Sequence, residues 1–309
     1  MFLGLDCGGT RCRYEWWPAG AAAGGDGAGA QPAVHGVEAT AERLAAVLGT
    51  ATTQHRPAAA VVALAGAGDP TVAAAVGQAL RARGVTVPVA VVGDVLAAAA
   101  AGLADGPGVL VWSGTGSFAV ARGADGTLHR VGGRGYLLGD QGSGYDLVRR
   151  AAAAALLAVD GLGPATALTE ALTRAFSAPA PARLGAVLQA LDSGQVAARL
   201  PTVLAIAADG DPIAADVVEA GVEGLVMLAF AAARLAGLDP RDLDVAGGGG
   251  VLLGSPAVVD LLGRRLQAAG ARPLRQLGER AAAAGAARLA RDWHEHREPN
   301  HGWVTRVAL

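Results

Sequence analysis

Three glycine-rich segments of the chain each follow a short apolar run, and each is suited to binding an anion. They are Asp6-Cys7-Gly8-Gly9-Thr10, Ser113-Gly114-Thr115-Gly116-Ser117 and Gly247-Gly248-Gly249-Gly250. Glycine lets backbone N–H groups approach a negatively charged group closely, and serine or threonine adds a hydroxyl donor. One such segment alone is usually only a turn, whereas three of them after strands predict a site that clamps a polyphosphate.

Three aspartates stand beside glycines or at the ends of predicted strands. Asp6 precedes the first glycine segment and is placed to hold Mg²⁺ through water, since Mg²⁺ keeps much of its hydration shell. Asp94 follows a buried strand and begins an alanine-rich helix, a position at which aspartate commonly caps the helix. Asp140 lies in Gly-Asp-Gln-Gly-Ser-Gly before another helix, where helix capping is again the interpretation that the residues alone favour.

The composition excludes several other chemistries and partners. All 25 basic residues are arginine, so a Walker-type lysine, a Schiff-base lysine and the strand lysine of protein kinases are absent. Cys7 and Cys12 are too few for a disulfide framework, a zinc site or a four-sulfur cluster. The net charge of −2 favours neither nucleic acid nor an anionic membrane. The first residues lack the basic part of a signal peptide, and the apolar run 151–159 is too short to span a bilayer, so we expect a cytoplasmic protein.

Hydrophobic patterning predicts two β-hairpins, each followed by further strands and helices, so one order of elements occurs twice. The first set comprises strands at residues 2–5, 10–17, 61–65 and 89–92 with helices at 38–49 and 71–83. The second set comprises strands at 109–112, 118–122 and 243–246, a mostly helical stretch from 144 to 238, and helices at 257–268 and 279–293. Residues 19–33 are rich in glycine and alanine, which predicts a flexible loop. We therefore predict two related α/β domains, residues 1–107 and 108–309, facing each other across a cleft.

The order of these motifs resembles the actin-like ATPase superfamily of sugar kinases, hexokinases and Hsp70-type chaperones. Within it, the chain is most similar to the N-acetylglucosamine kinase group, also called the BadF/BadG/BcrA/BcrD ATPase family. Leu-Asp-Cys-Gly-Gly-Thr resembles the first phosphate loop of the family, Val-Trp-Ser-Gly-Thr-Gly-Ser the second, and Val-Ala-Gly-Gly-Gly-Gly its adenosine segment. The block from Gly132 to Ala151 resembles the sugar-side loop and the helix that follows it.

The resemblance implies a fold of two actin-like, ribonuclease H-like α/β domains around a central cleft for ATP and sugar, with the last helix packing back on the N-terminal domain. It implies a kinase that uses ATP and Mg²⁺ to phosphorylate the primary 6-hydroxyl of an amino sugar, either N-acetylglucosamine or glucosamine. A homodimer is usual in relatives. The alternatives are an ATPase that couples hydrolysis to a conformational change and a non-catalytic sugar sensor.

The resemblance also assigns roles to individual residues. Asp94 is the base that takes the proton of the sugar hydroxyl, and Asp6 holds Mg²⁺ through water. The residues implied to hold ATP are Gly8, Gly9, Thr10, Arg11, Gly114, Thr115, Gly116, Gly247, Gly248, Gly249 and Gly250. Those implied to contact the sugar are Asp94, Ser113, Gly135, Tyr136, Asp140 and Gly144. Arg134 and Gln141 stand where the family commonly has Trp and Glu, so the sugar side departs from the family pattern more than the phosphate side does.

Overall fold

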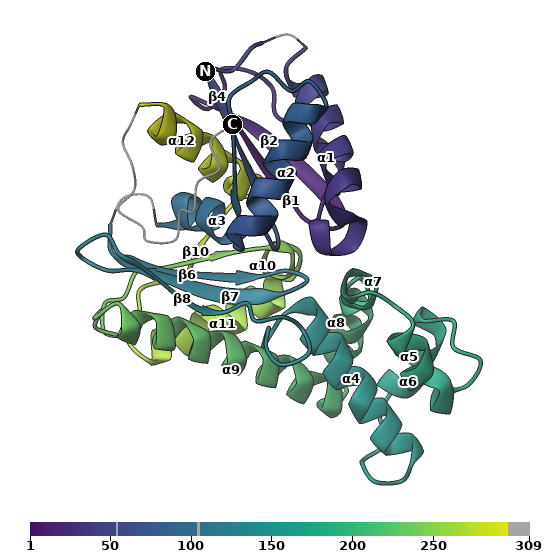
Figure 1. Ribbon diagram of the computed structural model, residues 1–309. Helices are drawn as coiled ribbons and strands as arrows, with labels where there is room; N and C mark the ends of the chain where they lie inside the picture. Colours follow the sequence, from purple (N-terminus) through teal and green to yellow (C-terminus); the bar gives the residue numbers. More distant parts are fainter. Residues whose placement is uncertain (54, 104–105, 296–309) are drawn as a thin grey trace. The chain divides into compact units, whose positions relative to one another are not determined.

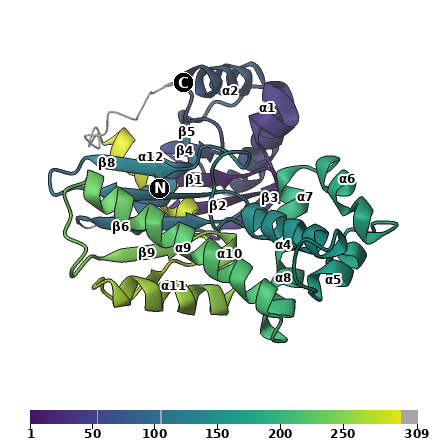
Figure 2. The same ribbon diagram turned by 90° about the horizontal axis from the view of Figure 1, so that it is seen from below.

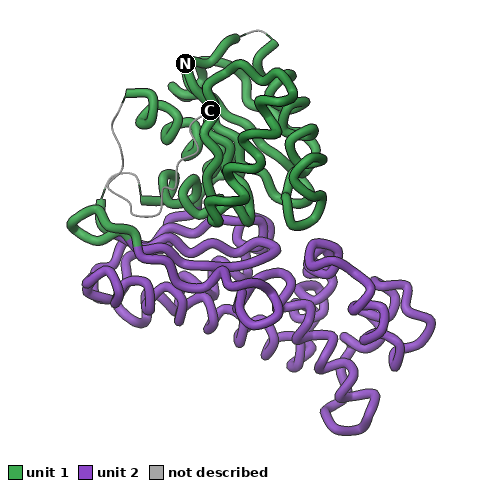
Figure 3. Tube along the Cα trace, viewed as in Figure 1, with its two compact units in different colours: residues 1–107, 122–128, 277–309 green, residues 108–121, 129–276 purple. Residues whose placement is uncertain are grey.

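The computed structural model describes residues 1–53, 55–103 and 106–295 and divides the chain into two compact units (Figures 1 and 3). Unit 1 contains residues 1–107 and 122–128 together with the described residues from 277 onward. Unit 2 contains residues 108–121 and 129–276.

Unit 1 is built on a five-stranded sheet in the order β3-β2-β1-β4-β5. Its strands are β1 (Phe2–Cys7), β2 (Arg11–Trp17), β3 (Gly25–Ala28), β4 (Ala59–Leu64) and β5 (Val89–Gly93). β2 pairs antiparallel with β1 and β3, whereas β4 pairs parallel with β1 and β5. All residues of β4 and β5 are buried, as expected for continuous apolar runs that are covered on both faces.

Helices cover both faces of this sheet (Figure 1). They are α1 (Pro32–Ala51), α2 (Pro70–Ala82), α3 (Asp94–Gly102) and α12 (Ala281–His294). α1 packs against α2 on one face, and α12 packs against α3, β1 and β4 on the other. The approach of α12 depends on small residues, because a Cβ on Gly4 would overlap the backbone of Ala287 and one on Gly285 would overlap the carbonyl of Ala97.

The prediction of a flexible loop at residues 19–33 is wrong in part, because Gly25–Ala28 forms the edge strand β3. This strand offers almost no apolar side chains, so no alternation marks it in the sequence. Its glycines are required by packing: a Cβ on Gly25 would overlap the ring of Tyr14, and one on Gly27 would overlap Val47.

Cys7 and Cys12 lie directly opposite each other at the end of the hairpin of β1 and β2 and are joined by a disulfide. Both side chains are buried. The sequence did not indicate this bond, because the hairpin register, rather than the separation along the chain, brings the two sulfur atoms together.

Unit 2 contains a second five-stranded sheet, in the order β10-β9-β6-β7-β8. Its strands are β6 (Gly108–Ser113), β7 (Ser117–Arg122), β8 (Leu128–Gly132), β9 (Val245–Gly248) and β10 (Arg275–Gln276). β9 pairs parallel with β6 and with β10. Starting from the hairpin edge, both sheets have the order third, second, first, fourth, fifth. The two related α/β folds predicted from the sequence are thereby confirmed.

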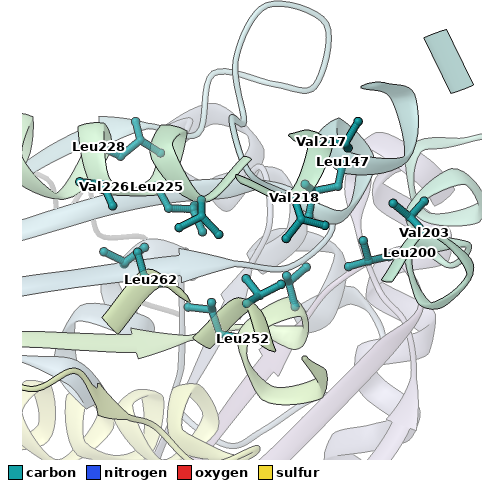
Figure 4. Close-up of a cluster of buried hydrophobic side chains, with 14 of the residues drawn as sticks. Leu147, Leu200, Val203, Val217, Val218, Leu225, Val226, Leu228, Leu252 and Leu262 are labelled. Atoms are coloured by element: carbon teal, nitrogen blue, oxygen red, sulfur yellow. The ribbon is translucent and has the colours of Figure 1, made fainter. Parts of the chain in front are cut away.

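The remaining helices all belong to unit 2, and most lie between β8 and β9. They are α4 (Gly144–Val159), α5 (Leu168–Ala175), the 3₁₀ turn η1 (Pro181–Arg183), α6 (Leu184–Gln189), α7 (Ser193–Ala197), α8 (Leu200–Ala208), α9 (Pro212–Leu235), α10 (Gly250–Gly254) and α11 (Pro256–Ala268). α9 packs against β6 and α11, and α4 packs against α7, α8 and α9 (Figure 2). Leu147, Leu225, Leu252 and Leu262 are fully buried in the core that these helices share (Figure 4).

Candidate functional site

The first glycine loop connects β1 to β2. The N–H of Gly8 donates to the carbonyl of Arg11 at 2.9 Å, which closes the turn. A Cβ on Gly29 would overlap the backbone of Gly9, so the segment after β3 lies directly against the loop. Thr10 and Arg11 are exposed. The tip of the loop is therefore open to a ligand while its base is fixed by the sheet.

Asp6 and Asp94 stand at the carboxyl ends of two strands of unit 1. Asp6 lies on β1, and Asp94 begins α3 directly after β5, with only β4 between the two strands. Burial of the Asp6 carboxylate raises its pKa to about 7, the negative charge of Asp94 adds to this rise, and Arg13 on the neighbouring strand opposes it. Two carboxylates that repel each other resist being ionised at the same time, and a nearby cation lowers the cost of ionising both. The pair thus fits the Mg²⁺ site predicted at Asp6.

The carboxylates of unit 1 do not form a complete cage for a metal ion. No group of three or more His, Cys, Asp or Glu side chains among residues 1–53, 55–103 and 106–295 is arranged to hold one. Mg²⁺ commonly uses one or two carboxylates together with water and substrate phosphates. A single contact to Asp6 through water is therefore consistent with this ion.

The second glycine loop joins β6 to β7, and serines on both sides fix it. The hydroxyl of Ser113 donates to the carbonyl of Gly142 at 2.8 Å, and that of Ser117 donates to the carbonyl of Gln141 at 2.7 Å. Thr115 at the tip of the loop is exposed. Both serine hydroxyls are thus engaged inside unit 2, and the role of Ser113 as a sugar contact stays a prediction.

Asp140 is buried beside this loop, with only 7% of its surface exposed. Its φ is +58°, which is uncommon for a residue other than glycine. A Cβ on Gly116 would lie 2.7 Å from Asp140 Oδ2, so the glycine leaves space for the carboxylate. Burial raises the pKa of Asp140. Hydrogen bonding from the backbone of Gly135 and Ser117 and the positive charge of Arg130 oppose this rise only in part. Oδ1 has no hydrogen-bond partner among the described residues, so it can accept a hydrogen bond from a ligand hydroxyl.

The third glycine segment lies against the second loop within unit 2. Gly247 and Gly248 end β9, Gly249 has a φ of +95°, and Gly250 begins α10. A Cβ on Gly249 would overlap the carbonyl of Ser113, so only glycine is accommodated at this position. Two of the three segments predicted to hold ATP are therefore adjacent in the structure.

The other predicted sugar contacts lie between β8 and α4. Gly135 has a φ of +96°, and Tyr136 is 42% exposed with its ring centroid 4.7 Å from that of Tyr145. Gly144 begins α4, and its N–H donates to the carbonyl of Gly114 at 2.8 Å. The bond from Gly144 attaches the start of α4 to the second glycine loop.

The predicted site residues thus form two groups, one in each unit. Unit 1 contains Asp6, Gly8, Gly9, Thr10, Arg11 and Asp94, and all the others belong to unit 2. Sequence reasoning missed Asp146, whose buried carboxylate holds the segment that contains Asp140. Its only signal was an acidic residue in the first turn of a helix, which is common at helix starts in general.

Comparison with protein families assigns almost the whole chain. The sequence pattern of the BadF/BadG/BcrA/BcrD ATPase family matches residues 3–290. The chain belongs to this family. The family resemblance inferred from the glycine segments is thereby confirmed, and the use of ATP follows from it. Within the described part of the chain, every helix is too short or too polar to cross a lipid bilayer.

Individual relatives agree with this assignment. The N-acetylmuramic acid/N-acetylglucosamine kinase of Clostridium acetobutylicum is 40% identical over 89 residues, which make up 29% of this chain and 29% of that protein. A solved structure of a candidate N-acetylglucosamine kinase from Chromobacterium violaceum is 26% identical, with a TM-score of 0.74 over 93% of this chain and 98% of that one. A ROK family glucokinase from Streptomyces griseus, solved with glucose and AMPPNP, is 20% identical with a TM-score of 0.60 over 94% and 99% of the two chains, and it shares the fold.

Proposed function

We propose that this protein is an ATP-dependent sugar kinase that phosphorylates the primary 6-hydroxyl of an amino sugar, with N-acetylglucosamine or glucosamine as the acceptor. The observation that supports this most directly is the buried Oδ1 of Asp140, which has no hydrogen-bond partner within the part of the chain that the structure describes and lies beside a glycine loop of the ATPase family pattern. An ionised carboxylate accepts strong hydrogen bonds from neighbouring hydroxyls. The names of two similar proteins point to the same class of acceptor.

Asp94 serves as the general base in this proposal. The oxygen of the 6-hydroxyl attacks the γ-phosphorus of ATP, the bond from that phosphorus to the β–γ bridging oxygen breaks, and ADP leaves. The proton of the hydroxyl passes to the Asp94 carboxylate. Asp94 is half-buried, and its Oδ1 accepts the N–H of Val95 at 3.0 Å, which fixes the orientation of the carboxylate.

The glycine segments provide the binding of ATP. Backbone N–H groups of the two loops would hold the phosphates, and the segment from Gly247 to Gly250 would hold the adenosine. Mg²⁺, when bound, neutralises the phosphate charge, and Asp6 would hold it through water. Because the pKa of Asp6 is raised to about 7, a bound cation would also keep this carboxylate ionised at neutral pH.

The test is a panel of sugars incubated with ATP and Mg²⁺, with ADP quantified and the product identified by mass and by NMR. We expect ADP and a sugar 6-phosphate in equal amounts, and only when an amino sugar is present. Rapid formation of ADP without a phosphorylated sugar would support the coupled ATPase instead. Saturable sugar binding without turnover would support the sugar sensor.

A further inference from the structure

The segment from Asp140 to Gly144, here called the acceptor loop, is attached to the second glycine loop through its carbonyl groups. Ser117 and Ser113 donate to the carbonyls of Gln141 and Gly142, at 2.7 and 2.8 Å. In both bonds the acceptor loop provides the carbonyl oxygen that accepts the hydrogen bond. The N–H of Gly142 points elsewhere and needs a separate partner, because an unpaired buried N–H is costly.

Asp146, on the first turn of α4, supplies this partner. Its Oδ2 accepts the N–H of Gly142 at 3.0 Å, and its side chain is only 6% exposed. Arg149 donates to Oδ1 at 2.8 Å, and Nε of Arg150 donates to Oδ2 at 2.9 Å. A carboxylate at this depth is tolerated only when it is paired in this way. Burial alone would raise the pKa of Asp146, but the bonds from Gly142, Arg149 and Arg150 outweigh it and hold the pKa below its usual value.

Position 142 of the acceptor loop accommodates only glycine. Gly142 has a φ of +73°, and a Cβ there would overlap the carbonyl of Gly221 on α9 and approach Leu225. The carbonyl of Asp140 accepts the N–H of Ser143 at 3.1 Å, so the two ends of the loop are linked. The bond from Gly142 to Asp146 therefore restrains the backbone that directs the Asp140 carboxylate.

We infer that Asp146 is a positioning residue for the sugar that accepts the phosphate. It holds the acceptor loop so that Asp140 presents its Oδ1 to that sugar, and Arg149 and Arg150 keep Asp146 ionised. This inference rests on the proposed kinase function. The Asp146 carboxylate is occupied by Gly142, Arg149 and Arg150. Its effect reaches the acceptor through Gly142 and Asp140.

The test is Asp146→Asn, followed by steady-state kinetics with the amino sugar and ATP varied separately. The amide keeps the size of the side chain but has one acceptor oxygen for three donors. We expect the KM for the sugar to rise by about 10-fold or more, the range for losing a hydrogen bond to a charged group. The KM for ATP should stay within about twofold, and kcat should fall less than the sugar KM rises.

Asp211→Asn is the matched control. Asp211 also accepts several donors at a helix start of unit 2, including Ala167 N–H at 2.7 Å and Ala214 N–H at 2.9 Å. We expect it to lower the melting temperature about as much as Asp146→Asn does, with no change in the sugar KM. A structural role for Asp146 would make the two variants behave alike.

The double variant Arg149→Ala/Arg150→Ala gives a second measurement in case Asp146→Asn does not fold. It keeps the carboxylate but removes its charged partners, and we expect a rise of a few-fold in the sugar KM. A sugar KM within twofold of wild type in every folded variant, or equal increases in both KM values, would overturn the inference. Failure of the wild-type protein to phosphorylate any sugar would overturn the proposed function, and the inference with it.

Discussion

In unit 1, β1 is the central strand of the sheet, with β2 and β3 on one side and β4 and β5 on the other. In unit 2, β6 has the same central position, with β7 and β8 on one side and β9 and β10 on the other. The central strand of each unit leads through three residues into the second strand of a hairpin. Counting from these loops, Asp6 of unit 1 corresponds to Trp112 of unit 2, and Cys7 corresponds to Ser113. The same position of the shared fold therefore has a carboxylate in unit 1 and an aromatic ring in unit 2.

The difference extends to what surrounds each loop. In unit 1 the disulfide of Cys7 and Cys12 closes the hairpin below the loop, and two carboxylates stand nearby. In unit 2 the indole of Trp112 stacks on Phe118, with ring centroids 6.3 Å apart, and the flanking serines attach the loop to the acceptor loop. In the proposed mechanism, unit 1 accordingly supplies the groups that handle charge and the proton. Unit 2 supplies the second glycine loop, which the serines attach to the acceptor loop, and the buried carboxylate of Asp140.

The second difference between the units is the number of helices in the connection from the third to the fourth strand, counted along the chain. Unit 1 has the single helix α1 there, whereas unit 2 has the helices from α4 to α9. α4 begins directly at the acceptor loop and joins the core that contains Leu147 and Leu225. The added helices thus provide the support from which Asp146 holds the loop.

Asp94→Asn gives the strongest test of the role of unit 1. The amide keeps the shape of the side chain but cannot take the proton of the hydroxyl. We expect kcat to fall by a factor of about 10²–10⁴, the range for the loss of a general base, with little change in ATP affinity. Asp69→Asn is the control, since Asp69 precedes α2 in the same unit and accepts from the N–H and the hydroxyl of Thr71 at the start of that helix. If Asp94→Asn retained more than about a third of the wild-type rate, the base would have to lie elsewhere.

Asp6→Asn should separate stability from activity in the same unit. The folded-state pKa of about 7 lies above the usual value near 4, so the folded protein binds a proton more tightly than the unfolded chain. The Asp6 carboxyl thus destabilises the fold progressively between about pH 4 and pH 7, and fully above pH 7. We expect Asp6→Asn without nucleotide to be more stable than wild type at pH 8, by at most roughly 4 kcal/mol, since three pKa units correspond to about that much.

The measurement is chemical or thermal unfolding of both proteins at pH 4.5 and pH 8. The stability advantage of Asp6→Asn should be largely lost at the lower pH, whereas phosphorylation of the sugar should be reduced at both. An advantage independent of pH would mean that Asp6 is not the titrating group.

Asp140→Asn tests the part played by unit 2. The amide can still accept one hydrogen bond but loses the charge that strengthens the bond from an acceptor hydroxyl. We expect kcat/KM for the sugar to fall by about 10- to 100-fold, while nucleotide binding measured by calorimetry stays close to wild type. An equal loss of nucleotide affinity would show that the variant disturbs the glycine loop beside it and not the acceptor alone.

The two units were not equally accessible to prediction from the sequence. Strands β4 and β5 of unit 1 are continuous apolar runs that are buried throughout, and the pattern predicted both closely. The edge strand β3 was not predicted. Its glycines leave space for the side chains of Tyr14 and Val47, and this packing between segments is not visible in the local sequence. The candidate residues were found from motif order, and their spatial relations came only from the structure: the contact of Gly249 with Ser113, and the bond that Asp146 makes to Gly142, depend on long-range packing.

Arg134 is the position where the smallest effect is expected, although it is the clearest departure from the family pattern. Its side chain is exposed in unit 2, and the acceptor loop is held by Asp146 and the serines rather than by this arginine. We therefore expect Arg134→Trp to leave the ratio of kcat/KM for N-acetylglucosamine to that for glucosamine within about twofold. A guanidinium that reached the acceptor would repel the ammonium group of glucosamine and pair with a carboxylate or hydroxyls instead. Its removal would then shift preference toward glucosamine, and a shift of 10-fold or more would place Arg134 among the residues that select the sugar.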